Sequence, residues 1–185
     1  SLETVAAAYY RQTVRDGISV GTFGYGRHYR ARPDAVPLEP FELPLTDRVM
    51  TTTRLNGIFG ALRDALPDSW GRRVIEREVG RTVLDEPFLL LHSPDDRAGA
   101  LSFGLGPKPP GPFRGYNRAI ELEKLLRLAE QILGDDDEPD PQLAQAEALL
   151  RPGTSMGGAR PKNVVEDADG LWIAKFPDRG DRWSN

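Results

Sequence analysis

The sequence has 185 residues, of which 39% are hydrophobic and 28% are charged, the composition of a globular protein of one or two domains with a substantial core. It contains no cysteine, which excludes disulfides, zinc thiolates and thiol catalysis, and its two histidines, His28 and His92, are too far apart in sequence to suggest a metal cluster. A net charge of −4 at pH 7 argues against non-specific nucleic-acid binding over the whole surface, and the lack of a long apolar run or a signal peptide favours a cytoplasmic protein.

The N-terminal part of the chain is expected to be rich in strands. Residues 4–10 and 18–25 predict two strands joined at the turn Asp16-Gly17, although the alanines at 6–8 leave a helix open for the first. We expect strands over residues 4–32, and then an extended segment that four prolines between 33 and 44 keep out of helix. From residue 53 the apolar spacing predicts an amphipathic helix that ends at Pro67. Its inward face would hold Leu55, Ile58, Phe59, Leu62 and Leu66.

Helices are predicted to dominate the middle of the chain. Asp68 or Ser69 can cap a helix that ends at Gly80 and buries Trp70, Val74, Ile75 and Val79. A short apolar piece at 88–91 and a strand at 99–104 follow, before a stiff proline linker at 106–116. Asn117 can cap a further helix, and a short helix is predicted over 142–150, with the acidic run at 135–138 interpreted as solvated loop rather than a metal site. The inward face of the helix after Asn117 would hold Ile120, Leu125, Leu128, Ile132 and Leu133.

Residues 153–176 carry the most chemistry. Residues 163–165 and 171–176 predict two strands joined by the turn Asp169-Gly170, and the adjacent glycines Gly157 and Gly158 precede this hairpin. Glycines let backbone N–H groups surround phosphate oxygens. Both faces of the second strand look apolar, so we expect Lys175 to be buried and to meet an anion. Kinases use this order of loop, hairpin and strand lysine to bind nucleotide phosphates; the alternative is an ordinary surface hairpin whose lysine reaches solvent.

Four stretches that follow one another over residues 18–177 resemble the HipA family of bacterial toxin kinases, the serine/threonine kinases of toxin–antitoxin pairs. They are Phe23-Gly24-Tyr25 with Tyr29 and Leu43-Pro44-Leu45, Ala65-Leu66-Pro67-Asp68-Ser69 with Arg72, Pro87-Phe88 through Gly99-Ala100, and residues 155–175. The resemblance implies an α+β chain: a β-rich N-terminal subdomain with helices at 1–105, a Pro/Gly linker at 106–116, and the start of a kinase-like N-lobe with glycine loop and β-hairpin at 117–185.

The resemblance also implies roles for residues of the loop and hairpin. Gly157, Gly158 and Ala159 match the loop that covers the phosphates, and Lys175 matches the strand lysine that meets them; the alternative for the loop is a tight turn. Ser155 matches a serine that the family autophosphorylates, with a plain polar loop residue as the alternative. Lys162 matches a lysine close after the glycines, with a solvated lysine as the alternative.

Cofactors and partners are implied in the same way. The parent kinase would use ATP and Mg²⁺, act on a protein of the translation machinery, and bind a HipB-like helix-turn-helix antitoxin, through which it would contact DNA only indirectly. The family's catalytic Asp and Asn and its magnesium-binding Asp lie well beyond the strand lysine, and Asp178 and Asp181 follow Lys175 too closely to replace them. We therefore expect no catalytic or metal-binding residue here and no phosphotransfer by this stretch alone. The alternatives are a non-catalytic module that binds an antitoxin, and an unrelated phosphate-binding enzyme.

Overall fold

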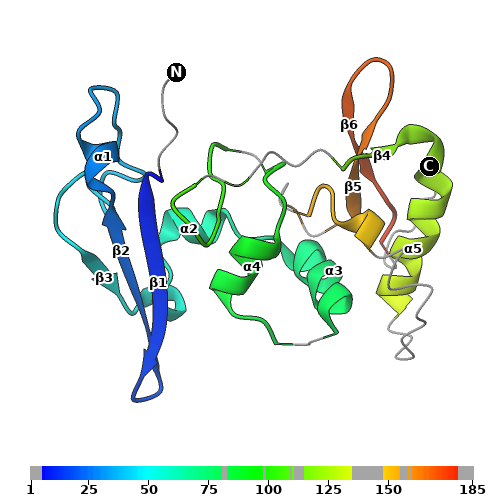
Figure 1. Ribbon diagram of the computed structural model, residues 1–185. Coiled ribbons are helices and arrows are strands. Elements are labelled where there is room, and N and C mark those ends of the chain that lie inside the picture. Colours follow the sequence, from blue (N-terminus) through cyan, green and yellow to red (C-terminus); the bar gives the residue numbers. More distant parts are fainter. Residues whose placement is uncertain are drawn as a thin grey trace. The chain divides into compact units, whose positions relative to one another are not determined.

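The computed structural model describes residues 6–80, 83–97, 99–108, 110, 115–134, 148–154, 158 and 160–178 (Figure 1). The chain has the predicted α+β class and divides into two compact units. Unit 1 comprises Ser1–Leu66 and Ser102–Gly111, and unit 2 comprises Pro67–Leu101 and Pro112–Asn185. The domain boundaries that we predicted at 105 and 116 stay predictions.

Unit 1 is built on a three-stranded antiparallel sheet in the order β1-β2-β3. Its elements are β1 (Ala8–Arg15), β2 (Ile18–Tyr25), α1 (Arg27–Arg30), β3 (Met50–Thr52), the 3-10 turn η1 (Arg54–Gly57) and α2 (Gly60–Asp64). The predicted hairpin is confirmed: Asp16 and Gly17 join β1 to β2 with φ values of 51° and 77°, the left-handed backbone that an Asp-Gly turn favours. The proline-rich segment after α1 is tied to β2 by the Tyr25 hydroxyl, which donates to Leu43 O at 2.6 Å and accepts from Leu38 N at 2.7 Å.

Two predictions for unit 1 are wrong. Residues 27–30 form the helical turn α1 instead of continuing a strand. The single helix predicted from residue 53 to residue 66 is interrupted, because Leu55, Asn56 and Gly57 all have positive φ and only 60–64 form α2. Packing on β2 explains the interruption: a Cβ on Gly21 would lie 1.8 Å from Gly57 O, so this backbone approaches the strand too closely for a regular helix.

Unit 2 combines helices with a small mixed sheet in the order β4-β5-β6. Its elements are α3 (Ser69–Val79), α4 (Glu86–His92), β4 (Asn117–Arg118), η2 (Ala119–Glu121), α5 (Leu122–Gly134), η3 (Ala148–Leu150), β5 (Lys162–Glu166) and β6 (Leu171–Lys175). Figure 1 shows the β5–β6 hairpin with α5 beside it. One buried cluster joins α3, α5, η3 and β5 and contains Trp70, Val74, Leu125, Leu128, Ala129, Ile132, Leu150, Val165 and Phe176.

The helix α3 follows its sequence signals closely. Asp68 is the N-cap, Gly80 ends the helix in the left-handed conformation with φ of 64°, and Trp70, Val74 and Ile75 are buried. The predicted strand–turn–strand unit is also confirmed, since β5 and β6 pair antiparallel and Lys175 lies on β6.

The region around Asn117 differs from its prediction. Asn117 is not a helix cap but a residue of β4, which pairs parallel with β5, and its side chain donates to Leu149 O at 2.5 Å and to Asn163 Oδ1 at 2.9 Å. The helix α5 starts only at Leu122, so Ile120 falls outside its apolar face and is 90% exposed. In this arrangement β5 is the central strand of the sheet, because β4 pairs with one of its edges and β6 with the other.

Of the remaining predictions for the second half of the chain, one is wrong and two fall partly or wholly outside the described residues. Residues 99–104 form no strand; Gly99 has a φ of 117°, which breaks an extended run. Of the helix predicted over 142–150, the described part is η3, and the acidic run at 135–138 lies outside the described residues. Among the helices that the structure describes, none is both long enough and apolar enough to cross a membrane.

Candidate functional site

The candidate site lies where the glycine loop enters the β5–β6 hairpin. The register of the hairpin places Lys162 directly opposite Lys175, and Phe176 N donates to Pro161 O at 2.8 Å just beyond this pair. Directly opposite residues of antiparallel strands point to the same face with Cβ atoms about 4.5–5.5 Å apart. The two lysines predicted to serve the nucleotide therefore project from one face of the hairpin, beside the end of the loop.

The two lysines have opposite environments. Lys162 is 2% exposed, whereas Lys175 is exposed to solvent. The expectation that both faces of the second strand are buried is wrong: Leu171, Trp172 and Ile173 are 49–54% exposed. The strand β6 is at the edge of the sheet, and no described element covers either of its faces fully. Of the two lysines, Lys175 is thus the exposed one, and Arg160 in the loop is exposed as well.

Lys162 is held by an ion pair in the interior of unit 2. Its ammonium lies 2.8 Å from Asp68 Oδ2 and also donates to the carbonyl oxygen of Gly158. The Lys162 side chain is 3% exposed and the Asp68 side chain 15%, so the pair is almost fully removed from water. The alternative of a solvated Lys162 is therefore wrong.

Asp68 links the start of α3 to the end of the glycine loop. Its Oδ1 atom caps the helix by accepting from Gly71 N at 2.8 Å, while its Oδ2 atom binds Lys162. The same turn adds a second link, because Trp70 Nε1 donates to Lys162 O at 3.1 Å. Each carboxylate oxygen of Asp68 thus has a separate task, one within the helix and one on the loop.

The first turn of α3 also presses against the N-terminal side of the loop. A Cβ on Gly71 would lie 2.3 Å from Thr154 O, a distance that no side chain tolerates. Thr154 is itself 0% exposed. Glycine at 71 is therefore needed for the loop to lie on the helix.

The loop is held at its N-terminal side by a second carboxylate. Gly153 N, with φ of 87° at that residue, donates to Asp96 Oδ2 at 2.8 Å. Burial raises the pKa of the Asp96 carboxyl, and the hydrogen bond from Gly153 acts in the opposite direction. Two residues earlier, Arg151 donates to His92 O at 2.8 Å and lies 3.5 Å from a carboxylate oxygen of Glu78.

The structure describes three of the predicted site residues, Gly158, Lys162 and Lys175, and not the other three. Gly158 is exposed, adopts φ of 96°, and is joined to Lys162 through its carbonyl. Ser155, Gly157 and Ala159 lie outside the described residues. Sequence reasoning missed Asp68, Trp70 and Asp96 as neighbours of the loop; the only signal was the cap motif at Asp68, which predicts a helix start and says nothing about a partner 94 residues away.

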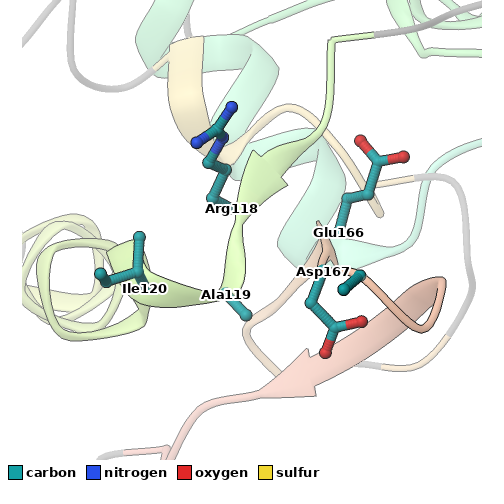
Figure 2. A pocket seen from close by; sticks show the side chains of 6 residues that line it. Arg118, Ala119, Ile120, Glu166 and Asp167 are labelled. Carbon is teal, nitrogen blue, oxygen red and sulfur yellow. The ribbon is translucent and has the colours of Figure 1, made fainter.

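A separate pocket of about 420 Å³ lies at the far end of β5 from the glycine loop (Figure 2). Arg118 and Glu166, which are paired in register, extend to one side of it, and Asp167 extends to the other. A hydrogen bond from the Trp172 side chain, and others from the backbone of the turn, lower the pKa of Asp167. The described residues that line this pocket include none of those predicted to bind the nucleotide.

The described residues contain no group of three or more His, Cys, Asp or Glu side chains arranged to hold a metal ion. Asp68 and Asp96, the two carboxylates at the loop, are committed to Lys162 and to the Gly153 N–H respectively.

Comparison with known proteins bears on the first half of the chain. The family model described as the HipA N-terminal domain matches residues 10–104. No curated protein matches the chain. The matched stretch contains both carboxylates that hold the loop, Asp68 and Asp96, together with Trp70.

Proposed function

The chain belongs to the HipA family, and from this premise we propose that residues 153–175 bind the phosphates of ATP as the nucleotide-side part of a HipA-like serine/threonine kinase. In this proposal Gly157, Gly158 and Ala159 cover the phosphates, and Lys175 pairs with them. Mg²⁺ and the protein substrate belong to the parent kinase of a toxin–antitoxin pair.

One observation carries the proposal: the hairpin register sets Lys175 opposite Lys162, beside the end of the glycine loop. Because Asp68 neutralises Lys162, Lys175 is left as an exposed positive charge on that face. An exposed ammonium on the strand that pairs with the end of this loop, in which Gly158 has a φ of 96°, supports the binding of an anion here.

Ser155 is proposed as the phosphorylated residue of the loop. A phosphate there would bring nearly two negative charges and three acceptor oxygens at pH 7. It would compete with the nucleotide for the same N–H groups and for Lys175, so phosphorylation would weaken nucleotide binding.

Titration calorimetry with Mg·ATP and with adenosine tests the phosphate-binding part of the proposal. We expect the chain to bind ATP more tightly than adenosine, and Lys175→Ala to weaken ATP binding about tenfold or more, since a hydrogen bond to a charged group is worth about 1.5–3 kcal/mol. Lys124→Ala, at an exposed lysine of α5, is the matched control and should bind like the original chain. Equal ATP affinity in all three proteins would contradict the proposal, as would no ATP binding.

A second candidate function is the docking of a HipB-like antitoxin by unit 1. The strand β1 lies at the edge of its sheet, and the β1–β2 hairpin exposes Tyr9 by 53%, Val14 by 70% and Ile18 by 56%. Unpaired backbone groups at a sheet edge with exposed apolar side chains are a surface on which another chain can add. This function requires no phosphotransfer.

The docking proposal predicts that Val14→Glu abolishes binding of the cognate antitoxin in calorimetry. Phe41→Glu is the control, because Phe41 is 92% exposed in the proline-rich segment and not on the hairpin. If both variants bind the antitoxin as the original chain does, the hairpin is not the docking surface.

A further inference from the structure

Both ends of the glycine loop are anchored to residues 67–97, which precede the loop by more than fifty positions in sequence. On the N-terminal side Gly153 N donates to Asp96 Oδ2 at 2.8 Å. On the C-terminal side Lys162 Nζ lies 2.8 Å from Asp68 Oδ2 and binds the Gly158 carbonyl. The anchors come from the loop after α4 and from the N-cap of α3, so residues outside the hairpin also hold the ends of the glycine loop.

The ammonium of Lys162 is committed to these contacts. It is buried, its charge is neutralised by a carboxylate, and a hydrogen bond to Gly158 O uses a second of its three donors. The Lys162 side chain is 3% exposed, so a nucleotide phosphate that paired with it would have to enter the interior of unit 2 and compete with Asp68 for the same charge.

We propose that Asp68 is a positioning residue for the phosphate loop: through Lys162 it fixes the Gly158 peptide group, and Lys175, rather than Lys162, supplies charge that meets the phosphates. This inference rests on the proposed function. It changes the role of Lys162 from a phosphate ligand to a residue that holds the loop in place. A peptide group is planar, so holding its carbonyl fixes the direction of the whole group, and that direction decides whether an amide N–H faces a phosphate.

The two roles of Lys162 predict different responses to Asp68→Asn. Asparagine is as good an N-cap as aspartate, so this change keeps the cap on Gly71 N and removes only the charge that holds Lys162. If Lys162 holds the loop in place, the loop becomes more mobile in this variant and ATP affinity falls. If Lys162 is a phosphate ligand, the change frees it and ATP affinity stays the same or rises.

The experiment compares ATP affinity and amide hydrogen exchange in the original chain, Asp68→Asn, Lys162→Met and the double variant. The double variant contains no unpaired buried charge, so it keeps the test open if a single variant unfolds. We expect all three to lose ATP affinity by a similar factor of about ten or more, the worth of one charged hydrogen bond. We also expect faster exchange, without nucleotide, in peptides that contain Gly158.

The matched control is Asp85→Asn. Asp85 caps α4 by accepting from Phe88 N at 2.8 Å, in the same geometry as Asp68, but holds no part of the loop. It should leave ATP affinity and the exchange of Gly158 peptides unchanged.

Two results would overturn the positioning role of Asp68. One is unchanged or higher ATP affinity in Asp68→Asn together with a loss in Lys162→Met; the other is exchange at Gly158 peptides that is the same in Asp68→Asn and in the original chain. Should the original chain bind no ATP, the phosphate-binding proposal fails by itself, and the exchange measurement still decides whether Asp68 fixes the loop.

Discussion

The ion pair between Asp68 and Lys162 should be one of the strongest single determinants of stability in unit 2. Its side chains are 15% and 3% exposed, and Lys162 is also bonded to Gly158 O. Removing one partner of a buried pair costs about 3–5 kcal/mol, because the other charge is left in the interior without compensation. We therefore expect Asp68→Asn to lower the free energy of unfolding by about that amount, even though the asparagine still caps α3.

Removing the lysine should cost less than removing the carboxylate. In Lys162→Met the remaining Asp68 carboxylate keeps its hydrogen bond from Gly71 N at the start of a helix, where negative charge is favoured, and it is closer to solvent than the lysine. The double variant Asp68→Asn/Lys162→Met leaves no bare charge and should be more stable than Asp68→Asn alone. The two changes are thus expected to be strongly non-additive, with a coupling energy of about 1–3 kcal/mol.

Guanidinium unfolding followed by circular dichroism measures all four corners of this cycle. Asp85→Asn is the control for the capping position itself and should change the free energy of unfolding by less than about 0.5 kcal/mol, since asparagine caps as well as aspartate. Additive effects of the two substitutions, or a loss below about 1 kcal/mol in Asp68→Asn, would refute the argument that burial makes this pair costly to break.

Three other substitutions test separate features. Gly71→Ala would place a Cβ 2.3 Å from Thr154 O and should lower the free energy of unfolding by about 1–3 kcal/mol, measured by the same denaturation, with an unchanged value contradicting the close contact. Tyr25→Phe removes a buried hydroxyl that donates to Leu43 O at 2.6 Å and should cost about 1–3 kcal/mol; a change near zero would show that the proline-rich segment does not depend on it. Burial raises the folded-state pKa of Asp96, so folding favours the protonated carboxyl. The stability gained in this way is complete below the unfolded pKa of about 3.9 and is lost as the pH rises through the folded-state pKa. The stability of Asp96→Asn relative to the original chain should therefore rise over that window in thermal melts at stepped pH, and a difference independent of pH would contradict this.

The features that the sequence predicted correctly depend on neighbouring residues. An Asp-Gly pair between two apolar runs predicts the β1–β2 turn, and Asp68 with Gly80 predicts both ends of α3. The β5–β6 hairpin and the place of Lys175 on its second strand follow from the same kind of local signal. In each case the information lies within a few residues of the feature.

The failed predictions depend on residues far away in the chain. The apolar spacing over 55–66 is that of a helix, but the contact of Gly57 with Gly21 requires a left-handed backbone that periodicity does not reveal. Ile120 has the right spacing for the apolar face of α5 and is nevertheless exposed, because β4 pairs with β5 and delays the start of the helix. Burial of Lys175 was inferred from apolar neighbours, but β6 lies at a sheet edge.

The candidate site was only half predictable for the same reason. Residues with a recognisable pattern, the glycines and the two lysines, could be found from the sequence. The carboxylates that hold the loop could not, since Asp68 and Asp96 are 94 and 57 positions from their partners and each has an ordinary local explanation, a helix cap and a loop acid. Which of the two lysines is buried could not be predicted either, because the burial of Lys162 depends on its contact with Asp68.

The helix α3 lies in the family-matched stretch by sequence and in unit 2 by its contacts. Within unit 2, Trp70 and Val74 share a core with α5 and β5. The same turn of helix that joins this core also carries the carboxylate on Lys162 and the glycine beneath Thr154. A change in the packing of α3 cannot leave the glycine loop unaffected, because a shift of the helix start moves Asp68 and with it the Gly158 carbonyl. The stability of this core and the geometry of the loop are thus coupled through the first turn of α3.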